Sequence, residues 1–339
     1  MNREPMDCIL PGIYRIPVPL AGNPLKELNS YLICGTDRNL LVDTGFHTED
    51  CRRAVEEGLA CLGVSMEHTD ILVTHLHADH AGNVPDLIRG DHRVYMSGID
   101  LDVMKQNWKS AGEREIHMQQ KQCLLKHGIA PLLVEEMLEA TPSRKLAGVE
   151  NFTGYTPLAD GDEITVGDYT LRAILTPGHT PGQMCFEILG TGAMLLGDHV
   201  LFDITPNITE WPGVEDSLGD YLESLDKIDR YDVTIPLPGH RKPGDFHSRI
   251  AALKEHHARR LQECREVIGK LGHAKLYDIA GNMTWRIRTD SWDTFPAAQR
   301  WFALGECLSH MDYLKKRGLI EEHVENGILW YSTCFFRQK

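Results

Sequence analysis

The 339-residue chain is long for a single hydrophobic core, so one large domain and a smaller one are expected. Its composition, 42% hydrophobic and 25% charged, is that of an ordinary globular protein, and no apolar run approaches the length of a membrane span. The nine cysteines are scattered, odd in number and without a CxxC pair, which argues against a disulfide framework and favours reduced thiols in the cytoplasm.

The formal net charge of -14 is unevenly distributed along the chain. Residues 1–245 hold 20 lysines and arginines against 38 aspartates and glutamates, whereas residues 246–339 hold 15 against 11. This shift predicts a domain boundary near residue 245. An acidic first domain can bind cations but is a poor non-specific binder of phosphate backbones.

Short strands and one helix are predicted at the start of the chain. The segments Ile13–Val18, Ser30–Cys34 and Asn39–Asp43 have strand character and are separated by turn residues. Glu49–Cys61 has helical spacing, with Thr48 as its N-cap. The order of strand, helix and strand predicts a layered arrangement with sites at the carboxyl ends of strands.

The stretch Ile71–Asn83 joins a buried strand to a cluster of metal-type ligands. His75 and His77 alternate along extended backbone and therefore point the same way. The chain must then turn, which adds the carboxylate of Asp79 and the imidazole of His80. Imidazole and carboxylate together suit zinc, manganese or iron.

Residues 98–149 form a helical insert in the predicted layout. The candidate helices are Asp100–Lys109, Glu113–His127 and Ala130–Ala140. Methionines along them indicate an adaptable apolar face. Two interpretations stay open, a packing layer or a cap that shapes the substrate pocket.

Three later strands also deliver a ligand-type residue at their exit. They are Tyr169–Leu175 with His179, Gly192–Gly197 with Asp198, and Asp232–Leu237 with His240. Together with the first stretch, the same event occurs four times. This recurrence indicates one shared site built from four strand ends.

The motifs THLHADH, TPGHTPG, LLGDH and LPGH, in this order, resemble the signature of the metallo-β-lactamase superfamily over about residues 10–245. The resemblance implies an α+β, four-layer αβ/βα sandwich with two divalent metal ions at one edge. Zinc is the first choice, with iron and manganese as alternatives. The ligands it implies are His75, His77 and His179 for one metal, Asp79, His80 and His240 for the other, and Asp198 as the bridge.

The implied chemistry is hydrolysis by a hydroxide that bridges the two metals, so no protein nucleophile is needed. Asp79 would accept and return a proton beside that nucleophile. Asp43 has two open interpretations, either orienting a ligand histidine or capping a turn. Arg241 is a candidate for binding a substrate carboxylate or phosphate, although a solvated loop residue is the favoured interpretation.

The C-terminal region is predicted to be helical with a closing hairpin. His247–Gly272, Ala274–Ala280 and Trp301–Arg317 have helical character, and Asn326–Gly327 is a type I′ turn signal. The layout resembles a winged helix, as in the superfamily branch related to the endoribonuclease lactamase-beta-like protein 2. The candidate recognition helix Phe302–Arg317 is basic only at its end, so packing or homodimer contact is favoured over nucleic acid.

The leading hypothesis is therefore a dinuclear hydrolase of a small thioester, ester or lactone, resembling the glyoxalase II-like part of the superfamily. The alternative is a metal-dependent nuclease, but the broad basic groove that backbone contacts require is missing from the sequence pattern. An iron-dependent enzyme resembling persulfide dioxygenases ranks third, because all seven ligand positions are present.

Overall fold

The computed structural model describes residues 7–88, 90–108, 115–140, 154–287, 289 and 291–334. The chain divides into two compact units, unit 1 with residues 1–106, 142–206 and 226–250, and unit 2 with residues 107–141, 207–225 and 251–339. No helix in the described part of the chain is long and apolar enough to cross a membrane.

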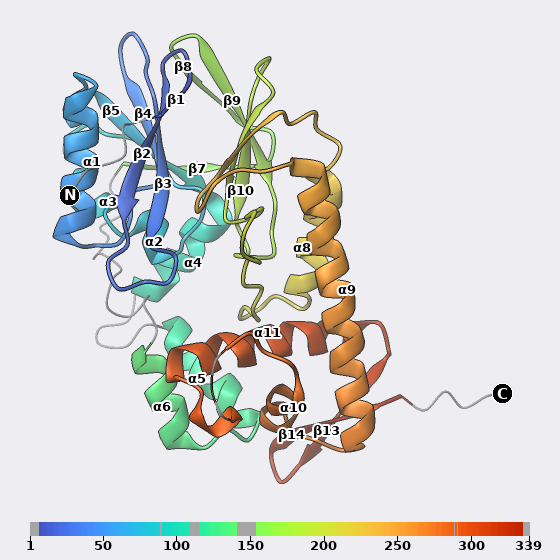
Figure 1. Cartoon of the computed structure of the whole chain (residues 1–339). Coiled ribbons are helices and arrows are strands. Elements are labelled where there is room, and N and C mark those ends of the chain that lie inside the picture. Colours follow the sequence, from blue (N-terminus) through green and yellow to red (C-terminus); the bar gives the residue numbers. More distant parts are fainter. Residues whose placement is uncertain are drawn as a thin grey trace. The chain divides into compact units, whose positions relative to one another are not determined.

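The first sheet of unit 1 follows the chain order from β1 to β7 (Figure 1). Its strands are β1 (Asp7–Leu10), β2 (Ile13–Pro19), β3 (Glu27–Ile33), β4 (Asn39–Val42), β5 (Thr69–Leu72), β6 (Val94–Ser97) and β7 (Tyr155–Leu158). Strands β1 to β4 pair antiparallel, and β4 to β7 pair parallel. The carboxyl ends of β4 and β5 therefore lie at the same edge of the sheet.

The second sheet of unit 1 has the order β12-β11-β10-β9-β8. Its strands are β8 (Glu163–Val166), β9 (Tyr169–Leu175), β10 (Met184–Ile188), β11 (Ala193–Gly197) and β12 (Ile235–Pro238). Strand β10 is antiparallel to both β9 and β11, and β12 is parallel to β11. As a result β9, β11 and β12 run in the same direction and end at one edge, as the recurrence of exit residues predicts.

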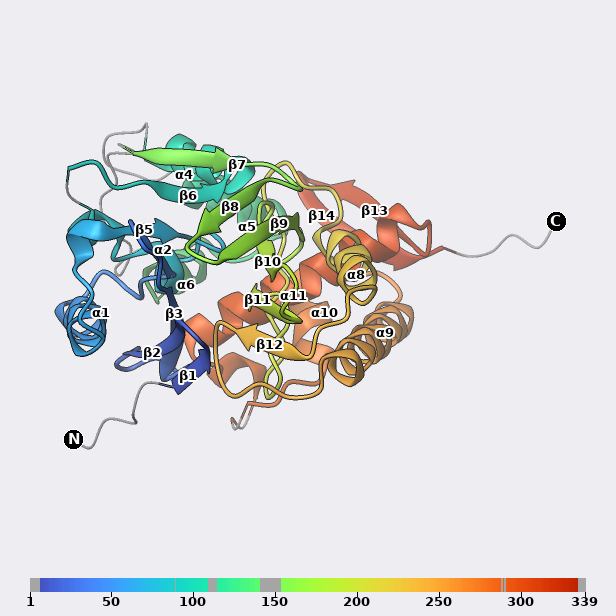
Figure 2. The ribbon, with the colours of Figure 1, turned by 90° about the horizontal axis from the view of Figure 1, so that it is seen from above.

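Alternate side chains of the first sheet enter two different cores. Ile16 and Leu41 pack with α1 (Glu49–Cys61) on the outer side, whereas Ile13 and Leu40 pack against the second sheet. Figure 2, the view from above, shows α1 on the side of the first sheet that faces away from β8 to β12. Side chains of α2 (Ala78–Ala81), α3 (Val84–Leu87) and α4 (Gly98–Trp108) belong to the same outer core as those of α1.

The helix α1 confirms its sequence prediction. It begins and ends at the predicted residues, and the Thr48 side chain accepts a hydrogen bond from the backbone N–H of Cys51. Glu49 and Asp50 place negative charge in its first turn, where the helix dipole favours it. These local signals mark the start of the helix.

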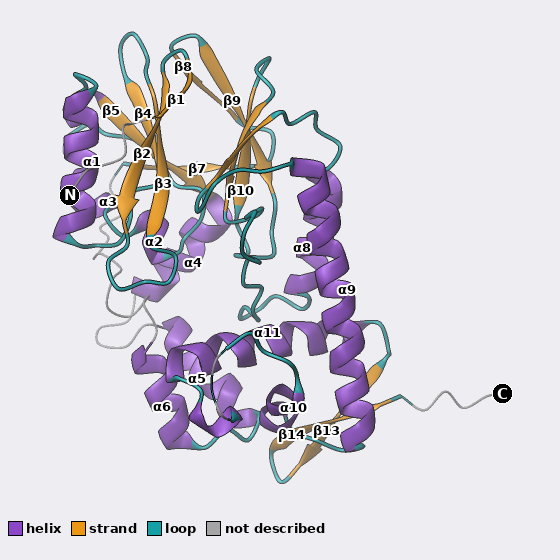
Figure 3. Cartoon of the chain, in the orientation of Figure 1, coloured by secondary structure: helices purple, strands orange, loops and turns teal. Residues whose placement is uncertain are grey.

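Unit 2 is mainly helical and carries a two-stranded hairpin (Figure 3). Its elements are α5 (Glu115–Lys126), α6 (Pro131–Ala140), α10 (Leu276–Asn282), α11 (Ala297–Lys316), the short 3-10 helix Trp292–Thr294, β13 (Ile320–Glu325) and β14 (Ile328–Thr333), with most of α8 (Ser217–Ile228) and α9 (Phe246–Leu271). In its core, Val134 and Met137 of α6 pack in one cluster with Leu304 and Leu308 of α11. The helices α5 and α6 therefore share a core with the C-terminal region.

The hairpin has the turn that its sequence predicts. Asn326 and Gly327 have φ angles of 51° and 79°, and β13 pairs with β14 in antiparallel register from Ile320–Thr333 to Glu325–Ile328. Two positive φ angles define a type I′ turn, which asparagine and glycine accept at low cost. The winged-helix interpretation of this region stays a prediction.

Some sequence predictions fall on residues outside the described ranges. These are the end of the helix predicted to Lys109, the start of the helix predicted from Glu113, and residues 141–149 of the predicted insert. The prediction of one domain boundary near residue 245 stays a prediction, while the structure groups residues 107–141 and 207–225 with unit 2.

Candidate metal centre

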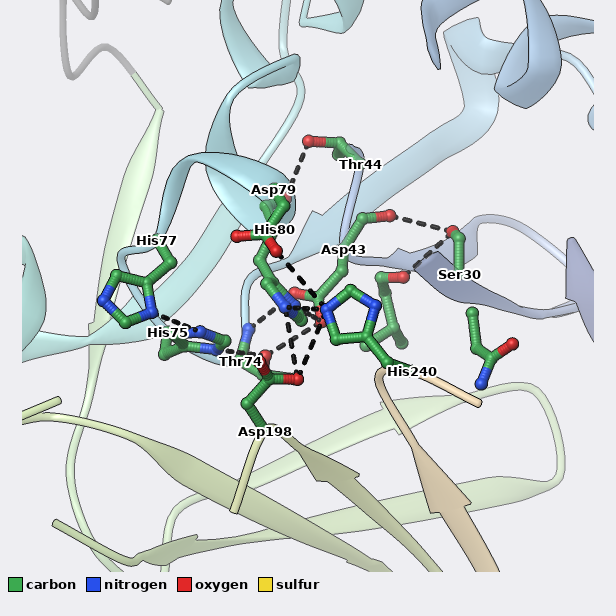
Figure 4. Close-up of polar contacts among 12 residues, drawn as sticks. Ser30, Asp43, Thr44, Thr74, His75, His77, Asp79, His80, Asp198 and His240 are labelled. Carbon is green, nitrogen blue, oxygen red and sulfur yellow. Dashed lines mark hydrogen bonds and ion pairs between the residues drawn. The ribbon is translucent and has the colours of Figure 1, made fainter. Parts of the chain in front are cut away.

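All seven predicted ligands lie in unit 1 and come from the exits of four strands. The loop after β5 carries His75 and His77 and continues into α2 with Asp79 and His80. The exits of β9, β11 and β12 carry the other three, which are His179, Asp198 and His240. Figure 4 shows side chains of both sheets pointing toward one another.

The first cluster consists of His75, His77 and His179. Nδ1 of His77 lies 3.1 Å from Nε2 of His75 and 2.9 Å from Nε2 of His179. One ligand atom from each residue lies within 4.8 Å of the others. His75 is fully buried and His77 is partly exposed, so the cluster is accessible from one side.

The second cluster consists of Asp79, His80 and His240. The Nε2 atoms of His80 and His240 are 3.3 Å apart, and Nε2 of His240 lies 3.4 Å from Oδ2 of Asp79. Both histidines have no exposed surface, whereas the Asp79 side chain is 13% exposed. Among these three residues, Asp79 is the one whose side chain is exposed to solvent.

Asp198 lies between the two clusters. Its Oδ1 atom is 3.5 Å from Nε2 of both His80 and His240, and its Oδ2 atom is 3.7 Å from Nε2 of His179. Oδ1 is buried and has no hydrogen-bond partner among the described residues. A buried carboxylate oxygen in this condition is costly unless a cation completes its surroundings.

Contacts at the outer ring nitrogens orient the ligand histidines. Nδ1 of His80 donates to Oδ2 of Asp43 at 2.7 Å, and Nδ1 of His240 donates to the carbonyl oxygen of Glu27 at 2.8 Å. In the neutral ring, each contact makes Nε2 the atom that presents a lone pair to the cluster. Of the two interpretations of Asp43, the structure therefore supports the orientation of a ligand histidine.

Asp43 is itself held from two sides. Its Oδ1 accepts a hydrogen bond from the backbone N–H of Thr74, and its Oδ2 accepts one from the hydroxyl of the same residue, both at 2.8 Å. The Thr74 hydroxyl also lies 3.1 Å from Nδ1 of His75. One carboxylate thus links the exit of β4 to the ligand-bearing loop after β5.

Strand β3 fixes the turn that presents His240, and sequence reasoning missed this function. The backbone N–H of Asn29 donates to the carbonyl oxygen of Gly239 at 2.7 Å, and its side-chain amide donates to that of Pro238 at 3.0 Å. The hydroxyl of Tyr31 also donates to Pro238, at 2.9 Å. Nothing local marks these residues, because their partners lie about two hundred positions away.

The electrostatics of the site favour a cation. Burial, reinforced by the neighbouring His179, lowers the pKa of His77 to about 3. Burial opposes ionisation of Asp79, but its contacts with His240 and His80 lower its pKa to about 2. The pKa of Asp198 is also lowered, because His240 and His80 outweigh its burial. Burial opposes a charge on His80 and His240, but Asp43 and Asp198 raise the pKa of His80 and Asp198 raises that of His240, so these two rings would release a proton when a metal ion binds.

The donor set fits two divalent metal ions. Nitrogens that each lie about 2.0–2.1 Å from a tetrahedral zinc are about 3.3 Å apart, and the facing nitrogens here are 2.9–3.3 Å apart. Imidazole and carboxylate donors with oriented outer nitrogens are typical of catalytic zinc, iron and manganese sites. The assignment of each ligand to one metal stays a prediction.

Arg241, the predicted substrate-binding residue, follows His240 directly. It has a φ angle of 66°, and its Nη2 donates to the carbonyl oxygen of Pro24 at 2.8 Å. Its backbone carbonyl accepts a hydrogen bond from the Asn29 side chain at 2.8 Å. The guanidinium is thus hydrogen-bonded to the loop between β2 and β3. The role of Arg241 toward a substrate stays a prediction.

The model of the metallo-beta-lactamase superfamily matches residues 26–240, so the chain belongs to this superfamily. Among solved structures, a metallo-beta-lactamase family protein from Thermus thermophilus is 29% identical with a TM-score of 0.78, covering 96% of this chain and 100% of its own. A beta-lactamase domain protein from Burkholderia ambifaria is 25% identical with a TM-score of 0.81, covering 97% and 94%.

The chain spans less than two thirds of the length of the curated relatives that it matches. The lactamase-like protein nscB of Aspergillus fumigatus is 27% identical over 74% of this chain, which spans 60% of that protein's length. An atrochrysone carboxyl ACP thioesterase of the same species is 30% identical over 52% of this chain and 30% of its own length. The predicted superfamily and the α+β fold class are confirmed, and relatives named as thioesterases agree with the prediction of a hydrolytic enzyme.

Proposed function

We propose that this protein hydrolyses a small thioester at a dinuclear metal site. The observation that carries the proposal is the pair of facing ligand clusters that share Asp198. The thioesterase names of two curated relatives support the choice of the thioester among the substrates that the sequence left open. The metal, with zinc first and iron or manganese next, is part of the proposal.

His75, His77 and His179 would hold one metal ion, and Asp79, His80 and His240 the other, with Asp198 between them. Two such ions would lower the pKa of a bound water and would polarise the carbonyl group of the substrate, whose carbon atom is the point of attack. The outer contacts of His80 and His240 hold their rings in place, so the site is preorganised before the substrate arrives.

Asp79 would handle the proton. It is the most exposed of the carboxylates in the clusters, and its Oδ2 faces His240 at 3.4 Å. From this position it can accept a proton from the attacking water. A thiolate leaves without prior protonation because a thiol has a pKa of about 8.5, so the site need not supply a strong acid.

The test is a substrate screen with protein loaded separately with zinc, manganese and iron(II). Small thioesters, lactones, phosphodiesters and single-stranded RNA are compared, and thioester loss is followed by its ultraviolet absorbance, since the chain's nine cysteines would react with thiol reagents. We expect thioester turnover to exceed that of every other class. Cleavage of RNA alone, falling steeply with salt, would instead establish the nuclease alternative.

His80→Ala provides the matched test of the site. We expect metal content to fall from two ions to one per chain and kcat to fall at least about 100-fold, because one ligand of the second cluster is lost. His68→Ala, at an exposed position, is the control. Circular dichroism checks that both variants fold. Wild-type turnover with two bound ions in His80→Ala would contradict the dinuclear proposal.

A further inference from the structure

We propose that Asp100 is a positioning residue that holds the two ligand loops of the first cluster in register and thereby sets the metal affinity of that cluster. The inference rests on the proposed dinuclear function. Asp100 lies in the first turn of α4 and has no exposed surface. It is not itself among the residues whose ligand atoms converge.

The carboxylate of Asp100 accepts hydrogen bonds from both loops. Its Oδ2 accepts from the backbone N–H of Leu76 at 2.9 Å and from the hydroxyl of Thr180 at 2.7 Å. Its Oδ1 accepts from the backbone N–H of Gly182 at 2.6 Å. Three donors converge on one buried carboxylate, which is a strong and directional arrangement.

The donors are placed beside the ligands. Leu76 lies between His75 and His77, and Thr180 directly follows His179. The first loop leaves a strand of the first sheet and the second leaves a strand of the second sheet. Asp100 therefore connects two segments about one hundred residues apart, at the point where their three imidazoles must meet within 4.8 Å.

The surroundings of Asp100 are built for this close approach. A Cβ atom at Gly182 would lie 2.5 Å from the backbone nitrogen of Asp100 and 2.7 Å from its Oδ1, so glycine is needed here. Burial raises the pKa of Asp100 to about 6, although the hydrogen bonds from the three donors act in the opposite direction and lower it. Burying an ionised carboxylate costs free energy. That cost agrees with a role in hydrogen bonding, which an apolar residue could not perform.

The test measures zinc affinity by competition with a chromophoric chelator in the His80→Ala background, where the first cluster binds alone. Asp100→Asn keeps the shape but turns an NH2 group toward the donors, so we expect the affinity to fall 10- to 100-fold. Thr180→Val removes a single donor and should lower the affinity less. Asp102→Asn, at an exposed position of the same helix, should leave it unchanged.

The second cluster is measured in the His75→Ala background, where Asp100→Asn should change its zinc affinity less than twofold. An unchanged affinity of the first cluster, or an equal fall at both clusters, would overturn the inference. If Asp100→Asn fails to fold, as judged by circular dichroism, Thr180→Val decides between the same outcomes. Because affinity is measured without substrate, a failed thioester screen would refute the proposed reaction without affecting this result.

Discussion

Asp43 combines an unfavourable backbone conformation with a precise contact. Its φ angle of 59° lies in the left-handed region, which costs a non-glycine residue about 1 kcal/mol. The cost is tolerated because the same geometry brings its carboxylate to His80 at 2.7 Å and to both donors of Thr74. Backbone strain of this kind is found mainly at functional sites, where a side chain has to be held in one orientation.

Asp43→Asn tests this function with little disturbance of the backbone, since asparagine also accepts the left-handed region. The new amide can still accept from Thr74, but its NH2 group would face Nδ1 of His80 and disfavour the required tautomer. We expect the zinc affinity of the second cluster to fall 10- to 100-fold, measured by chelator competition. Asp37→Asn, an exposed residue near the start of β4, is the control, and equal affinities in the two variants would contradict the prediction.

At the residue scale, sequence reasoning could find the ligands and offered Asp43 as one supporting residue, but it did not find the others. Histidine and aspartate at strand exits carry a chemical signal that repeats along the chain. Asn29, Tyr31 and Asp100 carry no such signal, because each is defined by a partner distant in sequence. Such contacts depend on tertiary structure and leave no local pattern.

At the element scale, the packing of α1 on β2 depends on a glycine within the helix. Gly58 is buried, and a Cβ atom there would lie 2.5 Å from Cγ2 of Ile16. Glycine normally weakens a helix interior by roughly 0.5–1 kcal/mol relative to alanine. Here the absence of a side chain allows the helix to approach the strand closely.

We therefore expect opposite results from the same substitution in two helices. Gly58→Ala should lower the free energy of unfolding by about 1–3 kcal/mol, because the added methyl group overpacks against β2. Gly269→Ala in α9, whose nearest neighbour would be Cγ2 of Thr333 at an ordinary 3.6 Å, should raise it by up to about 1 kcal/mol. Urea unfolding measures both changes, and stabilisation by Gly58→Ala would refute the packing argument.

Elements with strong local signals were predicted well, and others were not. The bounds of α1 and the turn of the hairpin followed from capping, charge and turn chemistry. Helix α8 was not predicted, although its buried Leu218, Tyr221 and Leu225 have helical spacing, so its periodicity was available in the sequence. The short strand β7 contains Pro157, which weakens any strand signal, and pairing with β6 defines it.

At the scale of the whole molecule, unit 2 holds a buried pair of histidines, His257 and His310. Nδ1 of His257 donates to Nε2 of His310 at 3.2 Å, and Nδ1 of His310 donates to the carbonyl oxygen of Glu306 at 2.7 Å. Burial lowers the pKa of His257 to about 2 and that of His310 to about 4. Arg260 and His256 nearby also disfavour a positive charge on His257.

Stability should therefore fall as the solution becomes acidic. Above pH 6.5 both histidines are neutral in the folded and unfolded chains, whereas between pH 6.5 and about 4 only the unfolded chain binds their protons. Each histidine can then cost up to about 1.4 kcal/mol per pH unit. Urea unfolding at pH 7.0 and 5.0 should show a smaller loss for His257→Leu than for wild type. His68→Leu, an exposed control, should keep the wild-type loss, and equal losses in all three would contradict the assignment.

The charge distribution along the chain indicates only part of how the chain divides into compact units. It separates an acidic body from a nearly neutral C-terminal region, and α9 to β14 lie in that region. It could not indicate that residues 107–141 and 207–225 group with unit 2, because their membership depends on packing and not on composition. The fold of unit 1 was accessible only because its ligand motifs resemble a known superfamily.

The core of unit 2 also has a consequence for biosynthesis. Val134 and Met137 leave the ribosome well before Leu308, and Tyr331 of the same core follows only near the end of translation. Helices α5 and α6 must therefore wait with their apolar faces uncovered while about 190 further residues are made, roughly 10–40 seconds at ordinary elongation rates. During that interval the nascent chain is a natural client for chaperones, and slow decoding after residue 140 would lengthen its exposure.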